Sequence, residues 1–116
     1  MYEYYNRTRL KDHTTWNATA YVHVKNKKVV SVGLQSYRTM VIRVKDDRMV
    51  VSGLYSMTTR RHIGWYLKEY YPWLSYYDIK DMYKKDMALD LNTKELVPLT
   101  DEEQEFVDNE YYGARI

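Results

Sequence analysis

The sequence contains no cysteine, two prolines, four scattered glycines and a single phenylalanine. Without cysteine, the chain can form no disulfide, no thiolate nucleophile and no cysteine-ligated zinc site. No apolar run reaches the roughly 18 residues that a membrane-spanning helix requires. The first residues also lack the basic and then apolar order of a signal peptide. These absences predict an intracellular protein that does not contact a membrane.

The aromatic content is dominated by tyrosine, with fourteen Tyr and three Trp in 116 residues. A tyrosine buries its ring but keeps a hydroxyl that needs water or a hydrogen-bond partner. One interpretation is a small core built from Tyr in place of Phe. The other is a contact surface, because exposed Tyr and Trp give a large rigid area at low entropic cost. A domain of this size cannot bury all of them, so we expect several on the surface.

Charge is distributed unevenly along the chain. Residues 1–72 hold thirteen Lys or Arg against five Asp or Glu, whereas residues 73–116 hold five against eleven. The resulting balances of +8 and −6 give the small net charge of +2. This segregation predicts a basic surface that binds an anionic partner and an acidic region elsewhere on the molecule.

The hydrophobic pattern predicts one α+β domain over residues 1–116. Residues 1–17 lack periodicity and are expected to form a flexible arm. Residues 18–55 alternate with period two and predict a small antiparallel meander of three to four strands, with turns at 26–27 and 46–47. In the second hairpin, Lys45 is expected to face Arg48, and Ile42 to face Val51.

The period then changes to 3.6 residues over 56–112, which predicts three helices packed on one face of the sheet. Ser56 or Thr58 can cap the first helix, which must end before Pro72. Ser75 with Asp78, and Thr100 with Glu103, have the spacing of capping boxes at the starts of the next two helices. Residues 88–99 are expected to form a connector between them.

Two short motifs give a resemblance to a known class of proteins. Ser-Tyr-Arg-Thr (36–39) and Tyr-Ser-Met-Thr-Thr-Arg-Arg-His-Ile (55–63) flank the second hairpin. This arrangement resembles small uncharacterised proteins of tailed bacteriophages over about residues 22–67. The resemblance implies a phage accessory protein, a class that often acts by binding host proteins in the host cytoplasm. It implies no catalytic residues.

The start of the first helix is a candidate site for an anion or nucleic acid. Helix N-termini present free N–H groups, and Thr58 and Thr59 add hydroxyl groups beside Arg60 and Arg61. The basic side of the preceding hairpin would extend this site. Its residues are Arg43, Lys45 and Arg48. The alternative is that the threonines are ordinary helix caps and the arginines are solvated.

Residues 65–77 contain seven aromatic side chains around a proline, which predicts a partner-binding patch. Its candidate residues are Trp65, Tyr71, Trp73 and Tyr77, together with Arg61, which lies one turn before Trp65. The alternative is that Trp73 folds back and closes the core between two helices.

Catalysis and metal binding have little support in the sequence. His62 precedes the apolar Ile63 and is expected at the edge of the core, and a metal site would require His13, His23 and His62 to converge. No catalytic triad, carboxylate pair or phosphate-cradling glycine loop is present. We therefore expect no enzyme, no metal and no cofactor.

The sequence favours a protein that binds a host protein, and the phage resemblance suggests inhibition of a host defence such as CRISPR or restriction. The alternative is a nucleic-acid-binding protein that uses its basic face and exposed tyrosines. A homodimer is a further interpretation, in which the basic face of one copy meets the acidic face of another.

Overall fold

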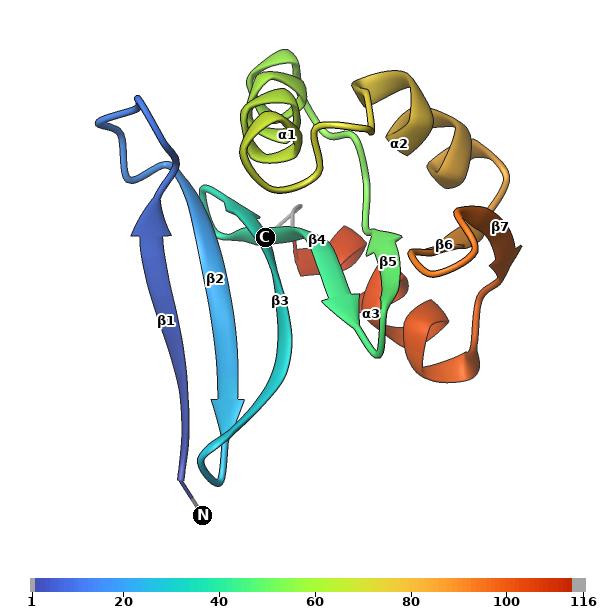
Figure 1. Ribbon diagram of the computed structural model, residues 1–116, viewed down its shortest axis with the longest axis horizontal. Helices are drawn as coiled ribbons and strands as arrows, with labels where there is room; N and C mark the ends of the chain where they lie inside the picture. The colour runs from blue at the N-terminus through green and yellow to red at the C-terminus, as the bar shows by residue number, and fades with distance from the viewer. Residues whose placement is uncertain (1, 114–116) are drawn as a thin grey trace.

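The computed structural model describes residues 2–113, which form one antiparallel sheet and three helices (Figure 1). The strands are β1 (Glu3–Arg9), β2 (Ala18–Lys25), β3 (Lys28–Ser36), β4 (Thr39–Lys45), β5 (Arg48–Val51), β6 (Met87–Asp90) and β7 (Glu95–Pro98). The helices are α1 (Met57–Tyr70), α2 (Tyr76–Lys84) and α3 (Asp101–Gly113). The sheet order is β1 to β7, so every strand pairs with its neighbours in sequence.

The expectation of a three- to four-stranded meander followed by three helices on one face is wrong. Seven strands are present, and α1 and α2 lie between β5 and β6. β1 occupies part of the region expected as a flexible arm, and β6 and β7 occupy the expected connector. β1 was missed because all seven of its residues are exposed, so it lacks the apolar alternation of a half-buried strand. β6 and β7 are only four residues each, too short for a clear period.

The predicted hairpin of β4 and β5 is confirmed in its register. Lys45 pairs with Arg48, Val44 with Met49 and Ile42 with Val51. Asp46 and Asp47 both have positive φ, which is the backbone of a type I′ turn. Asn26 and Lys27 have the same conformation between β2 and β3, although neither is glycine.

The three predicted helix starts are also present. The Ser56 hydroxyl accepts the Thr59 N–H at 3.2 Å, and the Asp78 carboxylate accepts the Ser75 N–H at 2.7 Å. Thr100 and Glu103 form a reciprocal capping box, with N–H to side-chain distances of 2.8 and 3.2 Å. α1 ends at Tyr70, two residues before Pro72.

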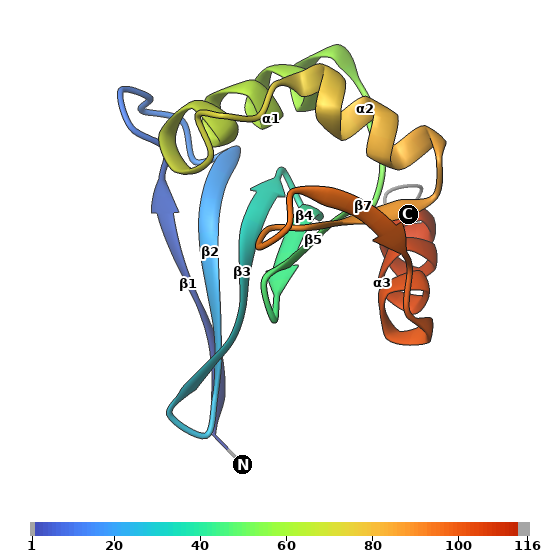
Figure 2. The same cartoon turned by 45° about the vertical axis from the view of Figure 1, so that its right-hand side comes forward.

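Helices cover both faces of the central strands. Side chains alternate along β4, so Ile42 and Val44 point to one face while Arg43 and Lys45 point to the other. The Ile42 face packs against α1 and α2 in the main hydrophobic core, which includes Ile63, Leu67, Ile79 and Met82. α3 contacts β4 and β5 through the opposite face, where Glu102 binds Lys45. Figure 2 shows α1 and α2 together over one side of the sheet, with α3 apart from them.

Candidate partner-binding surface

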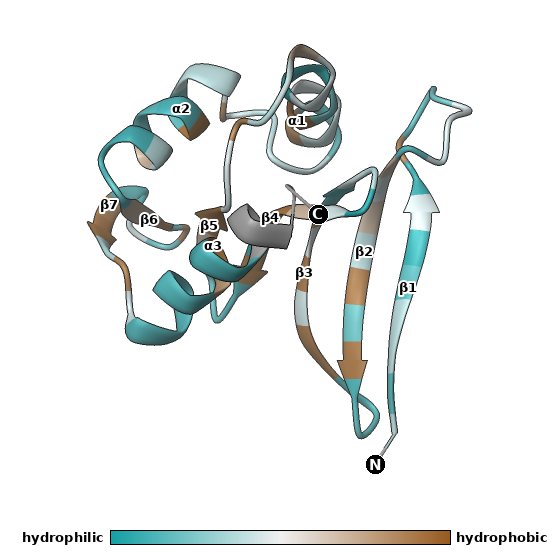
Figure 3. Cartoon of the chain, turned by 180° about the vertical axis from the view of Figure 1, so that it is seen from behind, coloured by the Kyte–Doolittle hydropathy of each residue, from teal (hydrophilic) through white to brown (hydrophobic). Residues whose placement is uncertain are grey.

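Strands β1, β2 and β3 extend beyond the helices (Figures 1 and 2), and we call this part the projecting sheet. β1 lies at the edge of the seven-stranded sheet. It is exposed along its whole length, and its sequence is hydrophilic beside the apolar positions of β2 (Figure 3). The surface therefore consists of polar and aromatic side chains on a regular backbone.

The α3 side of the projecting sheet carries a row of rings and cations. The register places Tyr5 opposite His23, and their rings are stacked with centroids 4.3 Å apart. Glu3 accepts a hydrogen bond from His23 or pairs with its imidazolium at 2.6 Å. The Arg7 guanidinium lies 5.4 Å from the centre of the Tyr5 ring. Its Nε donates to the Gln35 side chain at 2.7 Å, which holds the cation in the row.

Arg9 and Trp16 continue this row toward the loop after β1. The Arg9 guanidinium lies 5.0 Å from the Trp16 ring, within cation–π distance. Trp16 is 62% exposed, although tryptophan side chains are highly buried on average. We name the residues Tyr5, Arg7, Arg9, Trp16 and His23 the aromatic–basic row.

A hollow of about 330 Å³ lies between this face of the sheet and α3. Its walls include Tyr5 and His23 of the row, Arg43 of β4, and Glu102 and Phe106 of α3. The Arg43 guanidinium lies 4.7 Å from the Phe106 ring. The hollow thus combines aromatic surface with both signs of charge.

The three basic residues of the β4–β5 hairpin are held by acidic residues of α3. Arg48 donates two hydrogen bonds of 2.8 Å to the two oxygens of Glu103. Lys45 binds Glu102, and Arg43 lies 3.8 Å from the same carboxylate. Although burial opposes it, the bonds from Arg48 and Thr100 hold the pKa of Glu103 below its usual value. The predicted anion site at Arg43, Lys45 and Arg48 therefore faces carboxylates of its own chain.

The basic residues of the projecting sheet are placed differently. Six exposed cations lie on its strands and hairpins, and within the described part of the chain none of them forms an ion pair with an acidic residue. They are Arg7, Arg9, Lys25, Lys27, Lys28 and Arg38. Part of the positive charge that the sequence predicts on one surface therefore lies here, while other exposed cations, including Arg60, Arg61 and Lys68, lie on α1.

At the start of α1, the four expected anion-binding residues differ in their exposure. Thr59 is buried, and its hydroxyl lies 3.3 Å from that of Ser56 and 3.4 Å from that of Ser36. The Arg60 guanidinium lies 5.7 Å from the Tyr76 ring. Thr58 is half-buried and Arg61 is exposed. Thr59 therefore belongs to the helix cap, while Arg60 and Arg61 remain exposed at the start of α1.

The two sequence motifs meet in one buried hydrogen-bond network. The Ser36 hydroxyl lies 2.7 Å from Nδ1 of His62, and both residues are 2% exposed. Burial, and to a lesser extent the nearby His13, lowers the pKa of His62. A neutral His62 therefore joins the β3–β4 hairpin to α1. His23 lies apart on the sheet, and no cluster of metal-ligating side chains exists among the described residues.

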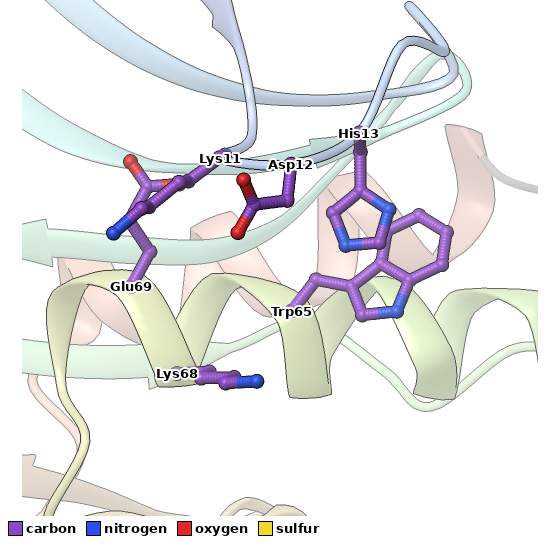
Figure 4. Close-up of a pocket in the computed structure, with 6 residues that line it drawn as sticks. All are labelled: Lys11, Asp12, His13, Trp65, Lys68 and Glu69. Carbon is purple, nitrogen blue, oxygen red and sulfur yellow. The ribbon is translucent and has the colours of Figure 1, made fainter.

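The aromatic residues predicted to bind a partner are separated by the fold. Trp65 is half-buried under His13, with ring centroids 3.6 Å apart, in a pocket of about 380 Å³ (Figure 4). Tyr71 lines an apolar groove of about 290 Å³ between β1–β3 and the end of α1. Trp73 and Tyr77 are exposed at the corner between α1 and α2, and Lys94 lies 4.8 Å from the Trp73 ring.

The pocket in Figure 4 is formed where the loop after β1 meets α1. The Lys11 N–H donates to the Glu69 carboxylate, and His13 stacks on Trp65. Lys68 and Asp12 complete its lining. These contacts attach the loop to the helix. The pocket therefore lies at a packing contact between them, and charged side chains form part of its lining.

The sequence does not predict the aromatic–basic row, because its pattern favours a flexible arm over residues 1–17, which hold four of the five residues of the row. The signal was the spacing of Glu3, Tyr5, Arg7 and Arg9, which alternate with period two. In a strand, this spacing places all four side chains on one face.

Comparison with known proteins gives one match. A family model, described as a family of unknown function (DUF8033), matches residues 6–88. The matched region runs from β1 to the start of β6 and includes both motifs and most of the aromatic–basic row. No curated protein and no solved structure matches the chain. None of the described helices is long and apolar enough to cross a bilayer. Because the family model covers well over half of the chain, the protein belongs to this family of unknown function, DUF8033.

Proposed function

We propose that this protein is a non-enzymatic binding protein that attaches to a host protein through the aromatic–basic row and the hollow beside it. The observation that carries the proposal is the stacked Tyr5–His23 pair with Arg7 above it on a fully exposed edge strand. Tyr and Arg are the residues that most often dominate binding energy at protein interfaces. Here they are held in place by their neighbours, so little side-chain entropy remains to be lost on binding.

The charge around this surface supports a protein partner with an acidic patch. The six unpaired cations of the projecting sheet would attract it and increase its rate of association. Glu102 lines the adjacent hollow and is largely exposed. A polyanion lying along the face would meet this carboxylate, whereas a protein surface can offer a basic or hydrogen-bonding group to it.

The biological setting follows from the resemblance of residues 22–67 to tailed-bacteriophage proteins. We infer a phage accessory protein that acts in the host cytoplasm and inhibits a host defence system, of the CRISPR or restriction kind.

Single-stranded nucleic acid is the second candidate, because a base can stack on an exposed ring beside an arginine. Tyr5 with Arg7, and Trp16 with Arg9, provide two such pairs. This candidate requires affinity for a labelled single strand that falls steeply with salt concentration. Absence of binding at low salt removes it.

The test of the protein partner compares variants of the row with a control. A tagged wild-type protein is used to capture host proteins, and the captured protein is then purified and titrated by calorimetry. We expect Tyr5→Ala and Arg7→Ser each to weaken binding by about 30-fold, the loss typical of an interface hot spot. Lys84→Ala, at an exposed position on α2, should leave affinity unchanged.

A further comparison separates this surface from the corner between α1 and α2. If Trp73→Ala weakens binding and the row variants do not, the contact surface is the aromatic corner and the proposed surface is wrong. Equal affinity for all variants would contradict both surfaces.

A further inference from the structure

The open edge of β1 differs from the edges of most sheets. Natural edge strands are usually protected by proline, lysine, a bulge or short length, because an unpaired strand can pair with another chain. β1 has seven residues, no proline and no lysine, and its register with β2 contains no shift. At the other edge of the sheet, β7 has only four residues and ends in Pro98.

The backbone hydrogen bonds show which residues of β1 face this open edge. The Asn26 N–H donates to the Tyr2 carbonyl at 2.6 Å, so Tyr2 directs its backbone toward β2. In an antiparallel pair, every second residue directs its N–H and C=O groups toward the partner strand, so Tyr4, Asn6 and Thr8 also direct theirs toward β2. The backbone groups of Glu3, Arg7 and Arg9 therefore point away from the sheet.

We propose that two copies of this protein pair antiparallel through their β1 strands, with a two-fold axis at Asn6. In this register Glu3 of one copy faces Arg9 of the other, Tyr4 faces Thr8, and Tyr5 faces Arg7. The residues that form the hydrogen-bonded pairs are then the odd-numbered ones, which are those whose backbone faces the edge. This register therefore forms the backbone hydrogen bonds between the two strands and also brings complementary side chains opposite each other.

Charge complementarity identifies a second copy as the occupant. The strand is acidic at its start and basic at its end, so an antiparallel copy brings two Glu–Arg pairs together on one face. Arg7 also meets the Tyr5 ring of the second copy, repeating the contact that it makes within its own chain. A parallel arrangement would instead place arginines beside arginines.

This pairing differs from contact between a basic face and an acidic face. Two carboxylates of the acidic region, Glu102 and Glu103, already bind Lys45 and Arg48 within the chain. The dimer proposed here uses the edge of β1 and leaves both faces of the projecting sheet exposed. It shares Tyr5, Arg7 and Arg9 with the proposed partner site, so sedimentation of the protein alone tests the dimer, and titration of the captured protein tests the partner site.

The first test uses sedimentation equilibrium with Arg7→Pro. Proline removes an N–H that faces the open edge, which an edge strand tolerates within its own sheet, but it blocks pairing with a second chain. We expect the wild-type protein and the control Arg7→Thr to form dimers, and Arg7→Pro to remain monomeric with an unchanged circular dichroism spectrum. A monomeric wild-type protein, up to the limit of its solubility, overturns the proposal, as does a dimeric Arg7→Pro variant.

The second test is a charge exchange that does not depend on proline. Arg9→Glu alone places carboxylates opposite each other in both pairs, and we expect it to weaken the dimer by about tenfold. The double variant Glu3→Arg with Arg9→Glu restores opposite charges, and its dimer should return to within about threefold of the wild-type constant. A double variant that dimerises no better than Arg9→Glu overturns the antiparallel register.

Discussion

At the level of single residues, Gly33 is a position where the sheet has no room for a side chain. A Cβ placed there would lie 1.8 Å from the Ile42 carbonyl oxygen and 2.8 Å from the Tyr21 ring. Tyr21, on the neighbouring strand, crosses over Gly33, and its hydroxyl donates to the Ile42 carbonyl at 3.2 Å. The glycine therefore allows a buried tyrosine to join three strands.

We expect Gly33→Ala to lower the free energy of unfolding by about 2–4 kcal/mol, because Tyr21 or the backbone of β4 must move. Urea denaturation measures this change. Gly64→Ala is the matched control, because a Cβ in that helix position meets no atom within 4 Å. The control should stabilise the protein by about 0.5–1 kcal/mol through helix propensity. A Gly33→Ala variant as stable as the wild type would contradict the packing described.

His62 predicts a dependence of stability on pH. Burial lowers its pKa below the ordinary value of 6.5, so the unfolded chain binds the proton more readily than the folded one. This contribution to stability is therefore complete above pH 6.5 and is lost as pH falls toward the folded pKa. We expect the free energy of unfolding to decrease in this window, measured by urea denaturation at a series of pH values.

The control for this prediction is His62→Asn, which removes the titrating ring but retains a polar group near Ser36. The decrease between pH 6.5 and the lower values should become smaller in this variant. An identical slope in both proteins would assign the effect to other groups.

At the level of secondary-structure elements, α3 is held by two carboxylates with different surroundings. Glu103 has a side chain only 7% exposed, and it binds Arg48 and the Thr100 N–H. Glu102 is 59% exposed and binds Lys45 at the surface. A buried carboxylate whose bonds are all made contributes more than an exposed ion pair.

We expect Glu103→Gln to lower the free energy of unfolding by about 2–4 kcal/mol, since the Arg48 charge loses its partner. Glu102→Gln should cost at most about 1 kcal/mol, because water competes for its bonds. Chemical denaturation of both variants at neutral pH tests the difference. Equal losses would mean that α3 is not docked through Glu103.

Elements with a strong local signal were predictable from the sequence, and elements defined by distant contacts were not. The Asp46–Asp47 turn set the register of β4 and β5, and Ser56, Ser75 and Thr100 marked the helix starts. β1 carries no buried residue to produce a pattern, and its pairing with β2 combines backbone hydrogen bonds with surface contacts such as the Tyr5–His23 stack, which involve residues distant in sequence. The side of the sheet that α3 covers could not be read from the periodicity of α3, because a helix stripe does not identify the face it packs against.

At the level of the whole molecule, the segregation of charge along the chain was predictable, but the position of the basic and acidic segments in the fold was not. Part of the acidic C-terminal region lies on the basic β4–β5 hairpin, where it neutralises Arg43, Lys45 and Arg48. Six further exposed cations lie on the projecting sheet, and others, including Arg60, Arg61 and Lys68, lie on α1. The candidate residues Trp65, Tyr71 and Trp73 were each identified as aromatic neighbours in sequence, but the fold directs them to three different places.

The short β7 with its terminal Pro98 has a consequence for how many copies can assemble. A sheet with two unprotected edge strands can add subunits without limit and form fibres. In the proposed pair, the β1 edge is used by both members, and the edge that each member leaves open is the four-residue β7 ending in Pro98. If the protein pairs in this way, we expect association to stop at the dimer rather than to continue into a fibre.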